Sequence, residues 1–114
     1  MSITKGFFQI SVIMLITLIY SSPAHAATNF ATFPDLQLGT TNAFVSKLQK
    51  VLNNNGFVIA PKGAGSVGQE SNYFGALTQK AVTSFQTTYG ITPMSGFFGS
   101  KTKAKMTELS AQGK

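Results

Sequence analysis

Cysteine and arginine are absent from this 114-residue sequence, and histidine occurs once, as His25. The lack of cysteine excludes disulfides and thiol nucleophiles, and a single histidine cannot supply the usual zinc ligand sets. A small domain without such supports depends either on a well-packed apolar core or on remaining bound to a partner surface. The ten phenylalanines, eight of them after residue 26, favour the apolar core.

Acidic residues are also few, and they do not form a catalytic constellation. Two carboxylates would suffice for a glycosidase, and the chain has three. Asp35 lies in the segment that precedes the first helix, Glu70 lies in a glycine-rich loop, and Glu108 lies on a helix flank near Lys105. Each is predicted to be a solvated or capping acid. The sequence therefore predicts a protein that is not an enzyme, with no catalytic residue, no metal site and no cofactor.

The charge balance is strongly basic, at +6 for the whole chain and about +5 once Lys5 is removed with the N-terminal segment. For a protein outside the cytoplasm, such a balance favours an anionic envelope polymer or a lipid surface as partner. All nine basic residues are lysines. Because phosphate recognition relies on the bidentate guanidinium of arginine, nucleic acid is not an expected partner.

Residues 1–26 have the layout of a secretory signal. Lys5 precedes an apolar run from Phe7 to Tyr20, and Ala24-His25-Ala26 supplies small residues at the positions that signal peptidase requires. We expect cleavage between Ala26 and Ala27, and hence export to the periplasm or the extracellular cell wall. The alternative is an uncleaved membrane anchor, although the run is short for a span of about 20 residues.

Three later segments carry the periodicity of amphipathic helices. The first begins near Asn42, the second covers about 76–89, and the third covers about 100–111. Gly56 and Gly90, each followed by an apolar residue, predict left-handed helix ends. The inward residues are expected to be Val45, Leu48 and Leu52; Thr78, Ala81, Val82, Phe85 and Tyr89; and Thr102, Met106 and Leu109. The outer face of the second helix is expected to carry Gln79, Lys80, Thr83, Gln86 and Thr87.

Two irregular segments accompany the helices. Residues 27–35 are predicted to be an extended lead-in whose phenylalanines pack on the rest of the chain, and the domain is placed at 36–112. The stretch 58–72, which contains Gly63, Gly65 and Gly68, is predicted to be a loop unusually long for a compact domain. Since three apolar stripes can be buried only against each other, the fold class predicted is an all-α three-helix bundle.

The stretch YFGALTQKAVTSF at 73–85 is repeated as FFGSKTKAKMTEL at 97–109. Phe74, Thr78, Val82 and Phe85 of the first copy correspond to Phe98, Thr102, Met106 and Leu109 of the second. Gly75 and Gly99 are expected to permit a tight entry into the first helical turn. The repeat is therefore interpreted as two turn-plus-helix units that each deliver one apolar stripe to a common core.

These motifs resemble the three-helix peptidoglycan-binding domain that accompanies bacterial and phage cell-wall hydrolases. The resemblance covers residues 36–109. It rests on several short motifs in the same order as in the family: Leu36-Gln37-Leu38-Gly39, Val45-Ser46-Lys47-Leu48-Gln49, Gly56-Phe57, Phe74-Gly75-Ala76-Leu77-Thr78-Gln79-Lys80-Ala81-Val82-Thr83-Ser84-Phe85-Gln86, Gly90-Ile91, and Gly96-Phe97-Phe98-Gly99-Ser100-Lys101-Thr102. It implies a small orthogonal three-helix bundle and binding of peptidoglycan as accessory to an enzyme.

The chain departs from the family pattern in three respects. Asn42 stands where the family often has glycine, a change expected to be mild because asparagine tolerates the left-handed conformation. The loop at 58–72 is longer than in many members. No catalytic domain is attached in this sequence.

The candidate ligand-binding residues are aromatic, amide and basic. Tyr73, Tyr89 and Phe97 are candidates for stacking on sugars, with local packing as the alternative. Gln49 and Gln86 are candidates for bonding ligand amides, with satisfaction of loop backbone as the alternative. Lys101 and Lys103 occupy the first turn of the third helix, where the helix dipole disfavours cations, so together they are candidates for an anion site. Gln79 and Lys80 are the polar residues that distinguish the first copy of the repeat.

The sequence predicts an exported, monomeric, non-catalytic module, and the family resemblance implies that it binds peptidoglycan without cutting it. The alternative is an interaction protein that uses the same scaffold to dock on, or regulate, a separate envelope enzyme. A third possibility is a cationic module that merely adheres to anionic envelope polymers.

Overall fold

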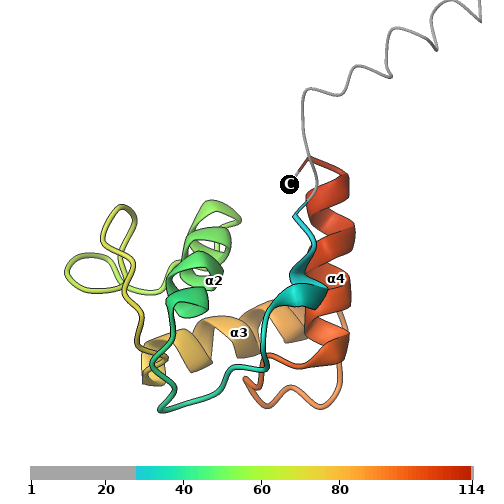
Figure 1. The fold of residues 1–114 in the computed structure, drawn as a ribbon, viewed down its shortest axis with the longest axis horizontal. Coiled ribbons are helices and arrows are strands. Elements are labelled where there is room, and N and C mark those ends of the chain that lie inside the picture. Colours follow the sequence, from blue (N-terminus) through green and yellow to red (C-terminus); the bar gives the residue numbers. More distant parts are fainter. Residues whose placement is uncertain (1–27, 114) are drawn as a thin grey trace, which may run out of the picture.

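A computed structural model describes residues 28–113, which form the predicted three-helix bundle (Figure 1). The helices are α2 (Ala43–Asn54), α3 (Ala76–Thr88) and α4 (Ser100–Ala111), and a short 3-10 turn, η1 (Phe30–Thr32), precedes them. Their bounds agree with the predicted ranges to within one or two residues. In Figure 1, α3 runs beneath α2 and the upright α4 stands beside them.

The expected signal, residues 1–26, lies outside the described residues. Among residues 28–113, none of the helices combines the length and the apolarity needed to cross a membrane.

Helix α2 begins and ends with recognisable capping interactions. At its start, the Asn42 side chain accepts a hydrogen bond from the backbone N–H of Phe44 at 2.7 Å. The backbone of Asn42 is extended, so asparagine serves here as an N-cap and its expected tolerance of the left-handed conformation is not used. At the other end, Gly56 has a φ of 91°, and Phe57 N–H donates to the carbonyl of Leu52. This is the predicted Schellman end, and Gly90 with Ile91 repeats it after α3.

The N-terminal segment belongs to the folded body. Phe30 and Phe33 are buried, and the lead-in expected to be extended forms the turn η1 between them. The backbone N–H groups of Thr28 and Phe30 donate to Ser110 Oγ at 2.8 Å and Thr107 Oγ1 at 3.0 Å, which attaches this segment to α4. The core therefore reaches back beyond the predicted domain boundary at residue 36.

Residues 36–41 form backbone hydrogen bonds with both copies of the repeat. The backbones of Leu36 and Phe98 exchange hydrogen bonds of 3.2 and 2.9 Å, an isolated antiparallel bridge. Further along, Phe74 N–H donates to the Thr40 carbonyl and its own carbonyl accepts from Gly39, both at 2.8 Å. The short segment thus satisfies backbone groups in the turn before α3 and in the turn before α4, and fixes one turn relative to the other.

The core lies where the helices and the N-terminal segment meet. Its fully buried side chains include most of the predicted inward residues: Val45, Leu48, Leu52, Phe74, Val82, Phe85, Phe98 and Met106. Leu109 and Tyr89 pack against this cluster but remain partly exposed. Burial of each such side chain contributes about 1.5–3 kcal/mol, and this apolar core takes the place of disulfides in holding the bundle together.

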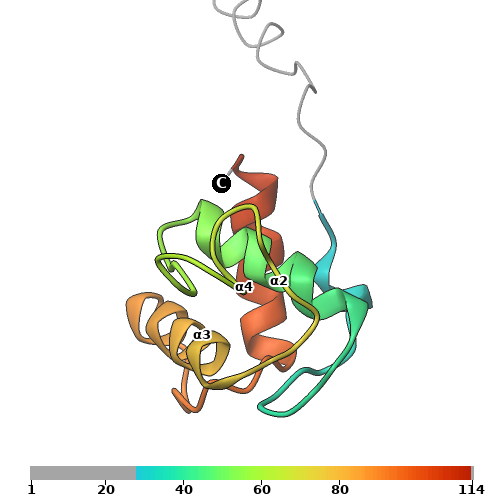
Figure 2. The ribbon, with the colours of Figure 1, turned by 90° about the vertical axis from the view of Figure 1, so that its left-hand side faces the viewer.

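Asn53, near the end of α2, makes three hydrogen bonds that hold the long loop at 58–72 against this helix. Asn53 accepts a hydrogen bond from Ile59 N–H at 2.8 Å, and its Nδ2 donates to the Gly65 carbonyl at 3.0 Å and to Glu70 Oε2 at 2.9 Å. Ile59 is buried as a result. The loop lies to the left of α2 in Figure 1 and faces the viewer in Figure 2.

Candidate functional site

Gln49, near the middle of α2, holds the turn that leads into α3. Its Nε2 donates to the Tyr73 carbonyl at 3.1 Å and to Thr78 Oγ1 at 2.9 Å, and its Oε1 accepts from Ser71 N–H at 2.6 Å. The side chain is buried, so these three hydrogen bonds of its amide group stabilise the fold.

Gln86, near the end of α3, holds the turn that leads into α4 in the same way. Its Nε2 donates to the Phe97 carbonyl and to Thr102 Oγ1, both at 3.0 Å, and its Oε1 accepts from Gly96 N–H at 2.8 Å. The sequence analysis placed Gln86 on the outer face of its helix, and this is wrong: Gln86 is buried. The second alternative considered for both glutamines, satisfaction of loop backbone, is what the structure shows.

The glycine after each aromatic pair makes room for a ring. A Cβ on Gly75 would lie 2.9 Å from Tyr73 Cε2, and one on Gly99 would lie 2.6 Å from Phe97 Cε2. Both glycines have negative φ, at −96° and −115°, so their conformation does not require glycine. The rings of Tyr73 and Phe97 therefore rest on backbone, and are held in place while remaining partly exposed.

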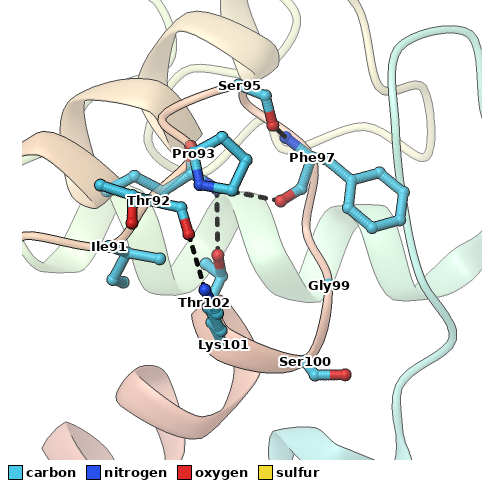
Figure 3. A pocket seen from close by; sticks show the side chains of 10 residues that line it. Ile91, Thr92, Pro93, Ser95, Phe97, Gly99, Ser100, Lys101 and Thr102 are labelled. Carbon is cyan, nitrogen blue, oxygen red and sulfur yellow. Dashed lines mark hydrogen bonds between the residues drawn. The ribbon is translucent and has the colours of Figure 1, made fainter.

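The turn that leads into α4 and the first helical turn of α4 form a pocket of about 150 Å³, here called the α4 pocket. It is lined by Ile91, Thr92, Pro93, Phe97 and Lys101 among others (Figure 3). Lys101 Nζ donates to the Thr92 carbonyl at 3.0 Å, which holds the ammonium group beside the pocket. Within residues 28–113, the two ion pairs found do not involve Lys101.

The turn that leads into α3 forms a corresponding pocket of about 210 Å³, here called the α3 pocket. Gln49, Ser71, Tyr73, Gly75 and Thr78 line it, as Gln86, Ser95, Phe97, Gly99 and Thr102 line the α4 pocket. Ser71 Oγ accepts from Tyr73 N–H, and Ser95 Oγ accepts from Phe97 N–H, at 3.3 and 3.2 Å. The position of Lys101 is taken by Leu77.

The remaining predicted binding residues are dispersed. Lys80 is exposed and lines a groove with Leu77 and Val58, next to the α3 pocket. Gln79 is half-buried. A Cβ built on Gly96 would lie 2.5 Å from Gln79 Cγ, so the turn that leads into α4 packs closely against this side chain. Tyr89 is half-buried in the aromatic cluster with Phe57 and Phe85, and Lys105 Nζ lies 5.5 Å from its ring centroid.

Lys103 does not share a site with Lys101. It is only 9% exposed, and its Nζ donates to the Phe33 carbonyl at 2.8 Å and to Asp35 Oδ1 at 2.6 Å. The expected pair of exposed lysines at the start of α4 is therefore reduced to Lys101. Lys103 attaches the N-terminal segment to α4. The position of Lys103 in the first turn of α4 did not predict this role, because its partners Phe33 and Asp35 are distant in sequence.

The three carboxylates have separate environments. Asp35 pairs with Lys103, and Glu108 pairs with Lys105 at 2.6 Å. The hydrogen bond from the Asn53 side chain, together with one from Gly68 N–H, lowers the pKa of Glu70. In the part of the chain that the structure describes, no three acidic, histidine or cysteine side chains gather into a metal site.

Fold and site together define a small helical module, built from a repeated turn-plus-helix unit with a pocket at each turn. Residues 41–106 match the family model described as "Putative peptidoglycan binding domain". The chain belongs to this family, which indicates peptidoglycan as its ligand and association with the cell wall. No curated protein and no solved structure matched the chain significantly.

Proposed function

We propose that this protein is an exported, non-catalytic monomer that binds peptidoglycan through the α4 pocket and so stays at the cell wall. The observation that carries the proposal is the ammonium group of Lys101, held by Thr92 beside a pocket whose rim includes the partly exposed ring of Phe97. Export is supported by the signal-like residues 1–26. The non-catalytic role is supported by the scattered carboxylates.

The α4 pocket suits a carboxylate. No side chain caps the start of α4, so backbone N–H groups of its first turn lie next to Lys101. Free amides at a helix N-terminus and an adjacent cation both favour an anionic group. Peptidoglycan offers carboxylates on its stem peptides, and the uncharged remainder of a stem can lie against Phe97 and Ile91.

The test is retention of the purified protein on isolated sacculi across a salt series. We expect binding that persists at high salt in the wild type, because surface charge attraction alone is screened. Lys101→Ala should weaken retention about tenfold, the loss expected for one charge-assisted hydrogen-bonded contact. Lys62→Ala, which removes an exposed lysine from the 58–72 loop, is the matched control and should leave retention unchanged.

Other results contradict the proposal in distinct ways. Loss of binding at moderate salt, with equal effects of Lys62→Ala and Lys101→Ala, would leave only charge attraction to anionic polymers. Absence of binding at any salt would refute wall binding and favour docking on a separate envelope enzyme.

A further inference from the structure

The α3 and α4 pockets lie at opposite ends of one helix. Ala76 and Leu77, in the first turn of α3, line the α3 pocket. Gln86, near the end of α3, and Ile91, just beyond it, line the α4 pocket. A helix of 13 residues is roughly 20 Å long, so a small ligand cannot occupy both pockets, whereas a polymer can.

The two pockets differ in charge although their frameworks correspond. Leu77 replaces Lys101, and the side chains lining the α3 pocket are all uncharged. Tyr73 and Leu77 are each 53% exposed there, and the exposed Ala64 adds further apolar surface above the buried Ile59. An exposed ring beside an aliphatic pocket fits the apolar face of a sugar ring and the methyl group of an N-acetyl substituent.

The exposed ring of Tyr73 is held in position before any ligand arrives. It rests on Gly75, and Gln49 and Ser71 fix the backbone of Tyr73 through its carbonyl and its N–H. A surface whose side chains are already ordered loses little conformational entropy on binding. Leu77 also lines the neighbouring groove with Val58 and Lys80, so the apolar surface continues beyond the pocket in a form that suits an extended chain of sugars.

We infer that the α3 pocket is a second binding site, for an uncharged N-acetylated sugar unit, and that both pockets engage one peptidoglycan polymer. The inference rests on the proposed function of the α4 pocket. The duplicated unit provides two anchoring points, of which the α4 pocket takes a stem carboxylate and the α3 pocket takes the glycan. Two linked weak contacts raise affinity for the polymer well above that for either fragment.

The experiment compares three ligands: a soluble stem peptide, glycan strands freed of their peptides, and intact sacculi. Tyr73→Ala and Leu77→Lys should each weaken binding of peptide-free glycan about tenfold and leave stem-peptide binding unchanged. Lys101→Ala should do the reverse. Because both pockets hold the same polymer, every one of these variants should weaken sacculus binding by about tenfold or more.

Val67→Ala is the control, since Val67 is exposed and lies outside both pockets. Chemical unfolding of each variant verifies its fold, and Leu77→Lys provides a surface change if Tyr73→Ala proves unstable. Wild-type binding to sacculi and stem peptide but not to free glycan, or unchanged glycan binding in Leu77→Lys, would overturn the inference alone. Failure of the wild type on all three ligands would overturn the proposed function as well.

Discussion

Gln49 and Gln86 make the same three hydrogen bonds in the two halves of the domain. Each donates to the carbonyl of an exposed aromatic residue and to a buried threonine hydroxyl, and each accepts from a backbone N–H of the turn. The repeat in the sequence is thus a repeat of hydrogen bonding as well as of apolar spacing. Each glutamine links its own helix to the turn at the beginning of the next helix.

Replacing Gln86 with alanine should lower the free energy of unfolding by about 2–3 kcal/mol. The substitution leaves Gly96 N–H and the Thr102 hydroxyl without their partner in a buried site, and desolvated polar groups without partners are costly. Urea unfolding followed by circular dichroism measures the change. Gln112→Ala, at an exposed position, should change stability by less than about 0.5 kcal/mol. Equal effects of the two substitutions would contradict the role assigned to Gln86.

The sequence allowed the helices, their ends and the core to be predicted because these follow from local patterns. Spacing identified Val45, Leu48 and Leu52, and Gly56 marked the end of α2 correctly. Gln86 was misplaced because helical periodicity assigns a face from polarity, and a buried amide with all partners satisfied breaks that rule. A clue was available: each glutamine directly follows a buried residue, and each turn has serine two residues before its exposed aromatic.

The candidate site was only partly predictable. Tyr73, Phe97 and Lys101, three of the candidate binding residues, line the two pockets, and their role in ligand binding stays a prediction. Lys103 and Tyr89 contact residues that the sequence alone does not bring near them, namely Asp35 for Lys103 and Phe57 for Tyr89. Contacts between distant segments depend on tertiary packing, which residue spacing within one helix does not reveal.

Lys103 and Lys101 should respond in opposite ways to replacement by methionine. Lys103→Met removes a charged hydrogen bond to the buried Phe33 carbonyl, so stability should fall by about 1.5–3 kcal/mol. The folded variant should bind sacculi nearly as well as the wild type. Lys101→Met should leave stability within about 0.5 kcal/mol and weaken binding. Unfolding and sacculus retention, measured on both variants, check the contrast; weakened binding by folded Lys103→Met would restore the two-lysine site.

Glu70 should make the stability of the domain depend on pH in the acid range. Its pKa in the folded protein lies below the ordinary 4.5, chiefly because Asn53 donates to the carboxylate. The unfolded chain therefore binds the proton more readily, and the stabilisation present above about pH 4.5 is lost as the pH falls through the folded-state pKa. The unfolding midpoint should fall less on acidification in Glu70→Gln than in the wild type. Glu108→Gln is the control, and parallel profiles for Glu70→Gln and wild type would refute the effect.

Gly99→Ala should alter the α4 pocket with little cost to the fold. The new Cβ would lie 2.6 Å from Phe97 Cε2, and the ring can swing away because it is 39% exposed. A φ of −115° is accessible to alanine, so the stability change should stay under about 1 kcal/mol while sacculus binding weakens. The effect should disappear when Phe97 is already alanine, as a double-mutant cycle would show. Additive losses would mean that Gly99 acts independently of the ring.

The N-terminal segment should be indispensable for folding, because it supplies one of the fully buried rings. Phe30 is 1% exposed, and a chain that begins at residue 36 also loses Phe33 and the Asp35 partner of Lys103. Phe30→Ala alone should cost about 3–5 kcal/mol, a large part of the stability of so small a domain. Chains beginning at residues 28 and 36, compared by circular dichroism and urea unfolding, test this. Thr32→Ala, at an exposed position of the same turn, is the control. If both chains unfolded at the same urea concentration, the domain would begin at residue 36 and the packing of Phe30 on the core would contribute nothing.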